Sequence, residues 1–562
     1  MPHIDPATLV LLRGTIRTLD PALPLATAVA IRDDTIVAVG SDTEIAAWIG
    51  PRTEVIDLAG ACVVPGINDA HLHLALFAES RMASRLNLHD ATSITEIRSQ
   101  ISSAAESLEE GTWIVGGSWH EKRIAEFTDG ARAPHSTDLD IAGSATPVVL
   151  HHDSLHSVWV NGAALEVGGI DRHTPDPAGG HIVRDGSGNP TGLLLESAGS
   201  LVTRHIPETD RDHRLTAMAD AMRHLNTLGV TSITDPVVWP QLLRDYVELR
   251  RQKRATVRVS ALLHWDWPST SSSDAGLAAA LDISGATTGL GDDWVRVGGI
   301  KLFADGVPSA HTACMHDPYP DGSIGDLVTA GDDSGERCAE LTRMVARAHR
   351  HRLDVQIHVT GDKAADLAID AVAAAQRSDP WPDARHALIH ATVLSADAPA
   401  RLRAHKISVV TQSLFKYHSG PGMLSALGRE RWNETFPVRR LLDAGVVVAD
   451  STDAPCVDPD WRLGMTTFTG GADHELARLP EGYELTAEEA LVAWTTAGAF
   501  LDRAEGRKGA LTPGALADMV VVDRDPLTAA PASLVNLGIL LTVVGGEVVH
   551  RSVSTTTGGV RP

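Results

Sequence analysis

Two histidines near the start of the chain have the spacing of a metal site. His71 and His73 are separated by one residue and directly follow an apolar segment, residues 61–69. In an extended chain, side chains two residues apart point to the same side, so both imidazoles would face one ion. Four further residues of ligand type lie in or directly after later apolar segments: Lys301, His358, His390 and Asp453.

Each of these residues also has a simpler structural interpretation when it is taken alone. A single buried histidine is more often a hydrogen-bonded core residue than a ligand, Lys301 could extend its ammonium group to solvent, and Asp453 could cap a helix or loop. The whole set is harder to assign to packing, because buried polar groups need partners. A pair of divalent cations would supply a partner to all of them.

The chemistry of the donors narrows the choice of cation. Imidazole and carboxylate ligands without a thiolate favour zinc, about two ions per chain, and Mn²⁺ or Fe²⁺ are the weaker alternatives. Lys301 becomes a ligand if it is desolvated and neutral, because a neutral amine reacts with carbon dioxide to give a carbamate. That anion could bridge two cations, so we expect carboxylated Lys301.

The elements that must position these residues follow a regular pattern. Eight apolar segments are predicted to be strands, and several are followed by Ala- and Leu-rich helical patterns. The predicted strands are residues 61–69, 229–235, 257–265, 295–306, 353–362, 386–392, 407–413 and 446–455. Eight βα units predict a (β/α)8 TIM barrel, an α/β fold in which active-site residues lie at the C-terminal ends of the strands.

The remaining segments suggest how the chain is organised around the barrel. Residues 1–60 and 501–562 both contain short strands and turns, and we expect them to form one small β-sandwich domain from the two chain ends. Residues 61–500 are predicted to form the barrel. Residues from about 85 to 210 do not follow the βα repeat, so they are predicted to be an insertion after the first barrel strand.

Composition excludes several classes of protein. The formal net charge is -24, with acidic residues spread along the chain, which argues against nucleic acid or an anionic membrane as a partner. The four cysteines lie far apart, so we expect neither a disulfide framework nor a thiolate zinc site. We expect no signal peptide and no segment that spans a bilayer, because no stretch is long and apolar enough. We expect a cytoplasmic protein that acts on a small molecule and forms a homo-oligomer, specifically a homodimer.

The motifs that carry these residues resemble those of a known family. The string VVPGINDAHLHL, followed in order by Lys301, His358, His390 and Asp453, is similar to the amidohydrolase superfamily. Supporting stretches are PVVLHHDSLHSVWVNGAAL, GNPTGLLLESA, QIHVTGDKAADLAIDA and KGALTPGALADMVVVDRDPL. The resemblance runs nearly end to end and is greatest to the YtcJ-like branch, which includes N-substituted formamide deformylases.

The resemblance implies roles for individual residues. His71, His73 and Asp453 would hold one metal, and carboxylated Lys301 would bridge to a second metal held by His358 and His390. Pocket roles are implied for four residues: Trp119, Asp153, His156 and Asp305. The position of Lys416 and His418 after the seventh strand makes them further candidates for substrate binding. Asp305, Glu196 and Asp362 are also candidates to orient ligands or cap helices.

This chain departs from the branch at three positions: Leu155, Ile389 and His120. None is a predicted metal ligand, so these departures concern the substrate pocket.

The expected reaction is hydrolysis of a carbon–nitrogen bond other than a peptide bond, in a linear N-substituted amide or formamide. Metal-activated hydroxide would attack the carbonyl, with Asp453 as the proton shuttle and His390 and Lys301 as further catalytic residues. Alternatives on the same metal site are a cyclic-amide hydrolase, a decarboxylase, and a deaminase with one metal in which His390 polarises the substrate. A non-catalytic scaffold is a further alternative, although such a relative should have lost ligands that this chain keeps.

Overall fold

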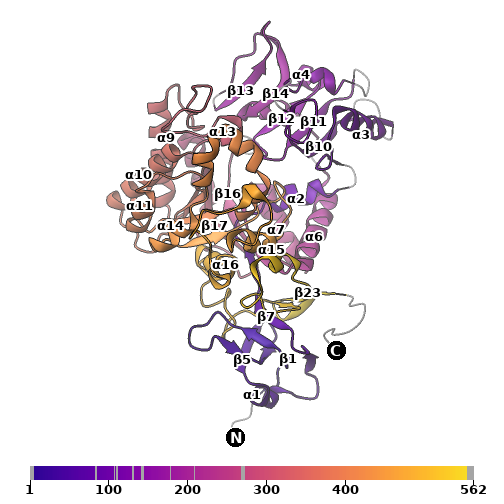
Figure 1. The fold of residues 1–562 in the computed structure, drawn as a ribbon, viewed down its shortest axis with the longest axis vertical. Helices are drawn as coiled ribbons and strands as arrows, with labels where there is room; N and C mark the ends of the chain where they lie inside the picture. Colours follow the sequence, from indigo (N-terminus) through magenta and orange to yellow (C-terminus); the bar gives the residue numbers. More distant parts are fainter. Residues whose placement is uncertain are drawn as a thin grey trace.

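The computed structural model describes residues 5–552, with gaps at 83–84, 107, 109–111, 129–131, 141–144, 178, 208 and 267–271. Figure 1 shows three parts along the long axis of the molecule. A barrel surrounded by helices lies in the middle. A β-rich insertion lies at the top, and a second β-rich part near both chain ends lies at the bottom.

The middle part is built on one parallel eight-stranded sheet. In sheet order its strands are β8 (Ile67–Asp69), β15 (Val230–Val238), β16 (Arg258–Leu263), β17 (Val295–Phe303), β18 (Val355–Val359), β19 (Ala387–His390), β20 (Ser408–Thr411) and β21 (Val448–Asp450). At the seam, the backbone amide of Ala70 donates to the carbonyl of Asp450 at 3.4 Å. The sheet is therefore a nearly closed barrel, and the predicted TIM-barrel fold is confirmed.

Helices follow the barrel strands and cover the outside of the sheet. The longer ones between strands are α6 (Arg211–Thr227), α7 (Pro240–Arg251), α8 (Asp274–Ser284), α9 (Ser334–Arg350) and α10 (Asp362–Ser378). Shorter ones are α2 (Leu74–Ser80), α11 (Ala398–Ala404), α12 (Ser413–His418), α13 (Gly420–Asn433), α14 (Val438–Asp443), α15 (Trp461–Phe468), α16 (Ala487–Ala493) and α17 (Thr496–Leu501). In α10 the buried positions Ala365, Ala368, Ile369 and Val372 recur every three or four residues, the period that turns one apolar face towards the barrel.

The first predicted strand, residues 61–69, is divided between two sheets. β7 (Cys62–Pro65) pairs antiparallel with β22 (Met519–Val522) outside the barrel, and only β8 belongs to the barrel. Pro65 has no backbone N–H to continue a ladder. At the next residue, a Cβ on Gly66 would lie 2.2 Å from Oγ1 of Thr231, so the chain crosses into the barrel at a point where only glycine fits.

Both chain ends build a β-sandwich below the barrel. One sheet contains β1 (Leu9–Leu12), β4 (Ala28–Arg32), β5 (Thr35–Gly40) and β6 (Glu54–Asp57). The other contains β2 (Thr15–Arg17), β3 (Leu25–Ala26), β7, β22, β23 (Ile539–Val544) and β24 (Glu547–Arg551). Leu11 of the first sheet and Val521 of the second are buried in one apolar cluster, so the two sheets pack face to face.

The insertion has its own six-stranded sheet. In sheet order it contains β13 (Gly180–Arg184), β14 (Pro190–Glu196), β12 (Ser157–Val160), β11 (Val148–His152), β10 (Ile114–Trp119) and β9 (Leu86–Asn87). Its helices are α3 (Ile94–Glu106), α4 (Gly162–Val167) and α5 (Ser200–Thr203). No helix in the described part of the chain is long and apolar enough to cross a membrane.

Two buried histidines, His349 in the last turn of α9 and His386 directly before β19, form a hydrogen-bonded chain. The amide of Val355 donates to Nδ1 of His386 at 3.0 Å, and Nε2 of His386 lies 2.9 Å from Nδ1 of His349. Nε2 of His349 in turn lies 2.6 Å from the carbonyl of Asp379. Because Nδ1 of His386 accepts a hydrogen bond from the amide of Val355, it carries no proton, and this chain of hydrogen bonds requires neutral His386.

This arrangement predicts a loss of stability in acid. Burial lowers the pKa of His386 to about 3, whereas an unfolded histidine titrates near 6.5. As the pH falls from about 6.5 towards 3, the unfolded chain takes up this proton before the folded chain does, so the free energy of unfolding decreases. We expect His386→Gln to have a flatter dependence of melting temperature on pH than the wild type over that range.

The control for this measurement is His173→Gln, since His173 is exposed on the insertion. Its pH dependence should match that of the wild type. If His386→Gln also keeps the full wild-type slope, the buried histidine chain is not the source of the acid sensitivity.

Candidate metal centre and pocket

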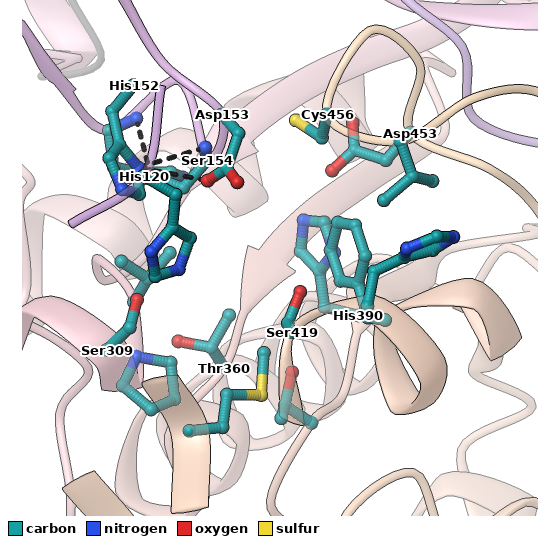
Figure 2. A pocket seen from close by; sticks show the side chains of 18 of the residues that line it. His120, His152, Asp153, Ser154, Ser309, Thr360, His390, Ser419, Asp453 and Cys456 are labelled. Atoms are coloured by element: carbon teal, nitrogen blue, oxygen red, sulfur yellow. Dashed lines mark hydrogen bonds and ion pairs between the residues drawn. The ribbon is translucent and has the colours of Figure 1, made fainter. Parts of the chain in front are cut away.

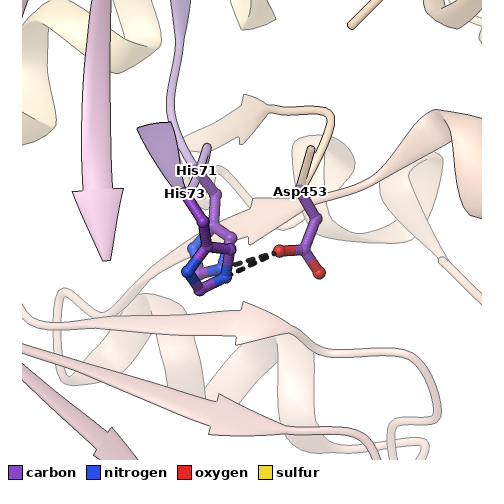
Figure 3. A group of neighbouring side chains, drawn as sticks. All are labelled: His71, His73 and Asp453. Carbon is purple, nitrogen blue, oxygen red and sulfur yellow. Dashed lines mark ion pairs between the residues drawn. The ribbon is translucent and has the colours of Figure 1, made fainter. Parts of the chain in front are cut away.

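His71, His73 and Asp453 meet at the mouth of the barrel. Oδ1 of Asp453 lies 3.3 Å from Nε2 of His71 and 3.1 Å from Nε2 of His73 (Figure 3). All three ligand atoms lie within 4.8 Å of one another. Within the described residues, the buried Oδ1 atom of Asp453 has no hydrogen-bond partner. A cation between these three side chains would supply that partner, so the residues fit a metal ion.

The backbone brings these residues together from opposite ends of the chain. The amide of Asp453 donates to the carbonyl of His71 at 2.8 Å, and the amide of His73 donates to the carbonyl of Ala454 at 2.9 Å. Asp69, at the end of β8, accepts from the Thr452 hydroxyl at 2.6 Å and from the Thr452 and His71 amides. The buried carboxylate of Asp69 thus joins the first barrel strand to the last.

The other predicted ligands lie beside this group. The ring centroids of His71 and His390 are 5.5 Å apart, and those of His390 and His358 are 4.5 Å apart. Lys301 Nζ lies 4.7 Å from the centroid of the Phe303 ring, which in turn contacts His358. The strand register explains this, because Phe303 of β17 pairs with His358 of β18, whose neighbour Val359 pairs with His390. All six residues predicted as ligands therefore gather at one end of the barrel.

Hydrogen bonds fix which nitrogen of His390 and of His358 is available. Nδ1 of His390 lies 2.7 Å from Oε1 of Gln412, and the Gln412 amide nitrogen donates to Ser451 at 2.9 Å. His390 must therefore carry its proton on Nδ1, which leaves Nε2 as the lone-pair donor. Nε2 of His358 lies 3.0 Å from the carbonyl of Gly306, which leaves its Nδ1. The sequence analysis did not identify Gln412, and its place directly after a barrel strand was the only signal for it.

Burial sets the charge of the site. It lowers the pKa of His390 to about 3 and holds the pKa values of His71 and His358 well below the usual range, so all three rings are neutral. Burial also lowers the pKa of Lys301 to about 7. For Asp453, burial raises the pKa, but the adjacent His71 and His73 outweigh it and hold the carboxyl group ionised. Neutral imidazoles and an ionised carboxylate are the protonation states that bind cations.

The backbone at two of these residues has an uncommon conformation. His390 has φ 68° and Asp453 has φ 59°, both in the left-handed region that residues other than glycine rarely adopt. Such conformations cost free energy and persist where the surrounding structure enforces them, as at functional sites.

A cavity of about 100 Å³ opens onto the ligands (Figure 2). Its barrel side includes His358, His390 and Asp453, with apolar surface from Phe415 and Met423. Its other side comes from the insertion and includes seven residues: His89, His120, Arg123, His152, Asp153, Ser154 and His156. The cavity is therefore formed jointly by the barrel and the insertion, which is a common setting for small-molecule sites.

The structure separates the six residues predicted to bind substrate into two groups. Asp153, His156 and His418 line the cavity, whereas Trp119, Asp305 and Lys416 are not among its lining residues. Trp119 is buried in the insertion, where Nε1 donates to the carbonyl of Leu150 at 3.0 Å. Lys416 is buried behind the cavity, where Nζ donates to the carbonyl of Trp432 at 2.7 Å and to the Thr435 hydroxyl at 2.9 Å.

Asp305 supports the site from behind. Its carboxylate accepts from the amides of Thr360 at 3.0 Å, Gly361 at 2.8 Å and Cys314 at 2.9 Å. These bonds fasten the segment that follows His358, so the contacts of Asp305 are those of a residue that orients the loop.

A second group of ligand-type side chains, His120, His152 and Asp153, lies on the insertion side of the cavity (Figure 2). Here the nitrogens of His152 are already engaged: Nε2 lies 3.0 Å from Glu121, and Nδ1 accepts from the Ser154 amide at 3.1 Å. Arg123 pairs with Asp153 at 3.2 Å and supplies a positive charge. Because these partners already satisfy the group, we interpret it as a hydrogen-bonded polar wall of the cavity.

Comparison with known proteins agrees with this geometry. The model of the Amidohydrolase family matches residues 54–550, and the chain belongs to this family of hydrolases. The putative amidohydrolase YtcJ of Bacillus subtilis is 30% identical over 536 residues, covering 93% of this chain and 96% of the relative. The N-substituted formamide deformylase of Arthrobacter pascens is 29% identical, covering 96% of this chain and 97% of the relative. The predicted membership of the superfamily and its YtcJ-like branch is confirmed.

Solved structures show the same architecture. An uncharacterized metal-dependent hydrolase from Pyrococcus furiosus matches with a TM-score of 0.69 and 25% identity, covering 92% of this chain and all of that one (100%). A second, from Pyrococcus horikoshii, matches with a TM-score of 0.72 and 24% identity, covering 93% of this chain and 99% of that one. The protein is therefore a metal-dependent hydrolase of the amidohydrolase superfamily.

Proposed function

We propose that this enzyme hydrolyses a carbon–nitrogen bond other than a peptide bond, in a linear N-substituted amide or formamide. The observation that carries the proposal is the meeting of four histidines, one buried lysine and one ionised aspartate beside a small cavity. The similarity to an N-substituted formamide deformylase over nearly the whole chain supports the choice of substrate class.

The ligand set suits two divalent cations, for which we propose zinc. His71, His73 and Asp453 would hold one, and His358 with His390 would hold the other, with Lys301 between them. When bound, such cations lower the pKa of water and polarise a carbonyl group. Gln412 keeps the lone pair of His390 available, and Asp69 holds His71 against Asp453.

Lys301 is proposed to carry a carboxyl group. A protonated lysine between two cation sites would suffer like-charge repulsion, and burial already disfavours its ammonium form. The neutral amine attacks carbon dioxide: an N–C bond forms, one proton leaves, and the side chain becomes an anion with two oxygen donors. The negative charge and the two oxygen donors of this side chain would then suit a position between two cations.

Asp453 is proposed to move protons during hydrolysis. Its ionised carboxylate lies at the cavity wall beside both histidines of the first site. There it could accept a proton from the attacking water and return it to the leaving nitrogen. The cavity is partly apolar at Phe415 and Met423, which would exclude bulk water from the reacting amide.

A product screen tests the proposal directly. Purified protein loaded with zinc would be incubated with N-substituted formamides, N-acyl amines and cyclic amides, and released carboxylic acid and amine would be measured. We expect turnover of the linear compounds. Turnover of cyclic amides alone, or release of ammonia or carbon dioxide from other substrates, would show that the same site catalyses a different reaction.

Metal content separates the two-metal site from a one-metal site. We expect close to two transition-metal ions per chain in gently purified protein, because the ligand set offers two adjacent groups of donors. Elemental analysis per mole of protein gives the number. A reproducible value near one that added zinc does not raise would contradict the two-metal site but not the assignment as a hydrolase.

A further inference from the structure

The insertion places a paired histidine and glutamate beside the metal centre. Nδ1 of His156 lies 2.8 Å from Oε2 of Glu196, and the two side chains are only 11% and 4% exposed. The His156 ring is 5.0 Å from the ring of His358, measured between centroids. His156 also lines the cavity. A side chain of the insertion therefore reaches the ligands of the barrel.

Glu196 contacts both the insertion and the barrel. It is the last residue of β14 in the insertion, and its other carboxylate oxygen accepts from the hydroxyl of Thr312 of the barrel at 2.9 Å. Thr312 and Glu196 lie close to the backbone of Gly306: a Cβ at this position would lie 2.1 Å from Oγ1 of Thr312 and 2.3 Å from Oε1 of Glu196. Only glycine at position 306 allows this contact.

The pairing decides which atom of His156 is available. A carboxylate can only accept hydrogen bonds, so Nδ1 of His156 must carry the proton that it shares with Glu196. That leaves Nε2 as the nitrogen free to contact a molecule in the cavity. The same arrangement, in which a partner on one nitrogen orients the other, is seen at His390 with Gln412.

Stability alone does not account for this pair. Replacing a buried ion pair with apolar residues of similar size is often neutral or stabilising, because both charges must be removed from water. Glu196 also has φ 51°, a backbone conformation that is unfavourable for a residue other than glycine. Strained, buried and charged residues that border a cavity are more consistent with a role in binding or catalysis.

We propose that the insertion completes the active site: His156 hydrogen-bonds the reacting amide of the substrate through Nε2, and Glu196 is the positioning residue that orients it. This inference rests on the proposed function, because it assigns the contact to the amide group. Thr312 extends the arrangement, since it fixes Glu196 to the barrel on which the metal ligands lie.

A double-mutant cycle tests whether Glu196 acts through His156. With the best substrate from the product screen, we expect Glu196→Gln to lower kcat/KM by about 10–100-fold, the usual effect of losing a residue that orients a site histidine. His156→Asn should lower it at least as much. In the His156→Asn background, Glu196→Gln should have no further effect, and both variants should keep the wild-type metal content.

Two further variants complete the design. Thr312→Val should lower kcat/KM, as Glu196→Gln does. The control is Glu166→Gln on the exposed surface of the insertion, which should leave kcat/KM unchanged. An equal loss from Glu196→Gln with and without His156 would overturn the proposal, because the glutamate would then act independently of His156. Loss of metal from His156→Asn would also overturn it, since His156 would then be a ligand.

A binding measurement keeps this test independent of the substrate class. Acetohydroxamic acid combines an amide-like group with metal-binding oxygens, and its affinity for zinc-loaded protein can be measured by calorimetry. We expect weaker binding, by about tenfold or more, to Glu196→Gln and His156→Asn than to the wild type. If the product screen fails but this difference is found, the positioning role stands and only the substrate class is wrong. Equal affinities would contradict the positioning role.

Discussion

Asp453→Asn is expected to lower kcat by at least about 10²–10⁴-fold, the range that general acid–base groups contribute. Asparagine keeps the shape of the side chain but cannot accept the proton of the attacking water. The fold should persist, because the amide of Asp453, rather than its side chain, makes the backbone bond to His71. Steady-state kinetics with the best substrate from the screen, together with circular dichroism, gives both readouts.

Metal content must be measured in the same preparation, since Asp453 is also a proposed ligand. Asp458→Asn is a matched control: Asp458 lies five residues further along the same loop, is exposed at the cavity, and does not belong to the group formed by His71, His73 and Asp453. Asp458→Asn should change kcat only slightly. Near wild-type kcat for Asp453→Asn with normal metal content would show that another residue moves the proton.

Lys301→Ala is expected to lose the second metal ion and most of the activity. The lysine side chain is 1% exposed at the barrel end where the histidines gather, and the alanine variant would leave two cation sites without a bridging anion. A short-chain carboxylic acid added from outside should restore part of both properties, because it can enter the vacated space and supply two oxygens. Elemental analysis and turnover, each with and without the acid, measure the effect.

Lys301→Met separates loss of a ligand from loss of packing. Methionine fills most of the volume, so it should lose metal and activity like alanine but should not be rescued by the added acid. Wild-type protein reconstituted with zinc in buffer depleted of carbon dioxide should be less active than protein given bicarbonate. If Lys301→Ala keeps two metals and full turnover, the lysine is a packed strand residue and carboxylation is wrong.

The sequence determined the barrel and the group of residues at its mouth. The reason is that both depend on local patterns: apolar β-branched segments form buried strands wherever they lie, and the C-terminal ends of parallel strands in one barrel must meet. Residues at those ends, such as His358 in β18 and His390 in β19, are therefore brought together by topology alone. Their family motifs add the same information, and the six predicted ligands lie side by side in the structure.

The tertiary structure decided what surrounds the metal centre. The division of residues 61–69 between two sheets depends on β22, which is more than 450 residues away in the chain, so no local pattern could show it. Lys416 follows a barrel strand, as a pocket residue would, but the fold of α13 places the carbonyl of Trp432 where it binds Nζ of Lys416 away from the cavity.

Local sequence patterns likewise could not predict the hydrogen-bond partners of the site histidines. Gln412 and Glu196 orient His390 and His156 through contacts between segments 22 and 40 residues apart. Such contacts depend on where loops and sheets pack, not on periodicity. The metal-binding function could thus be predicted from residue types at strand ends, whereas the pocket that selects a substrate exists only where the insertion and the barrel meet in the folded chain.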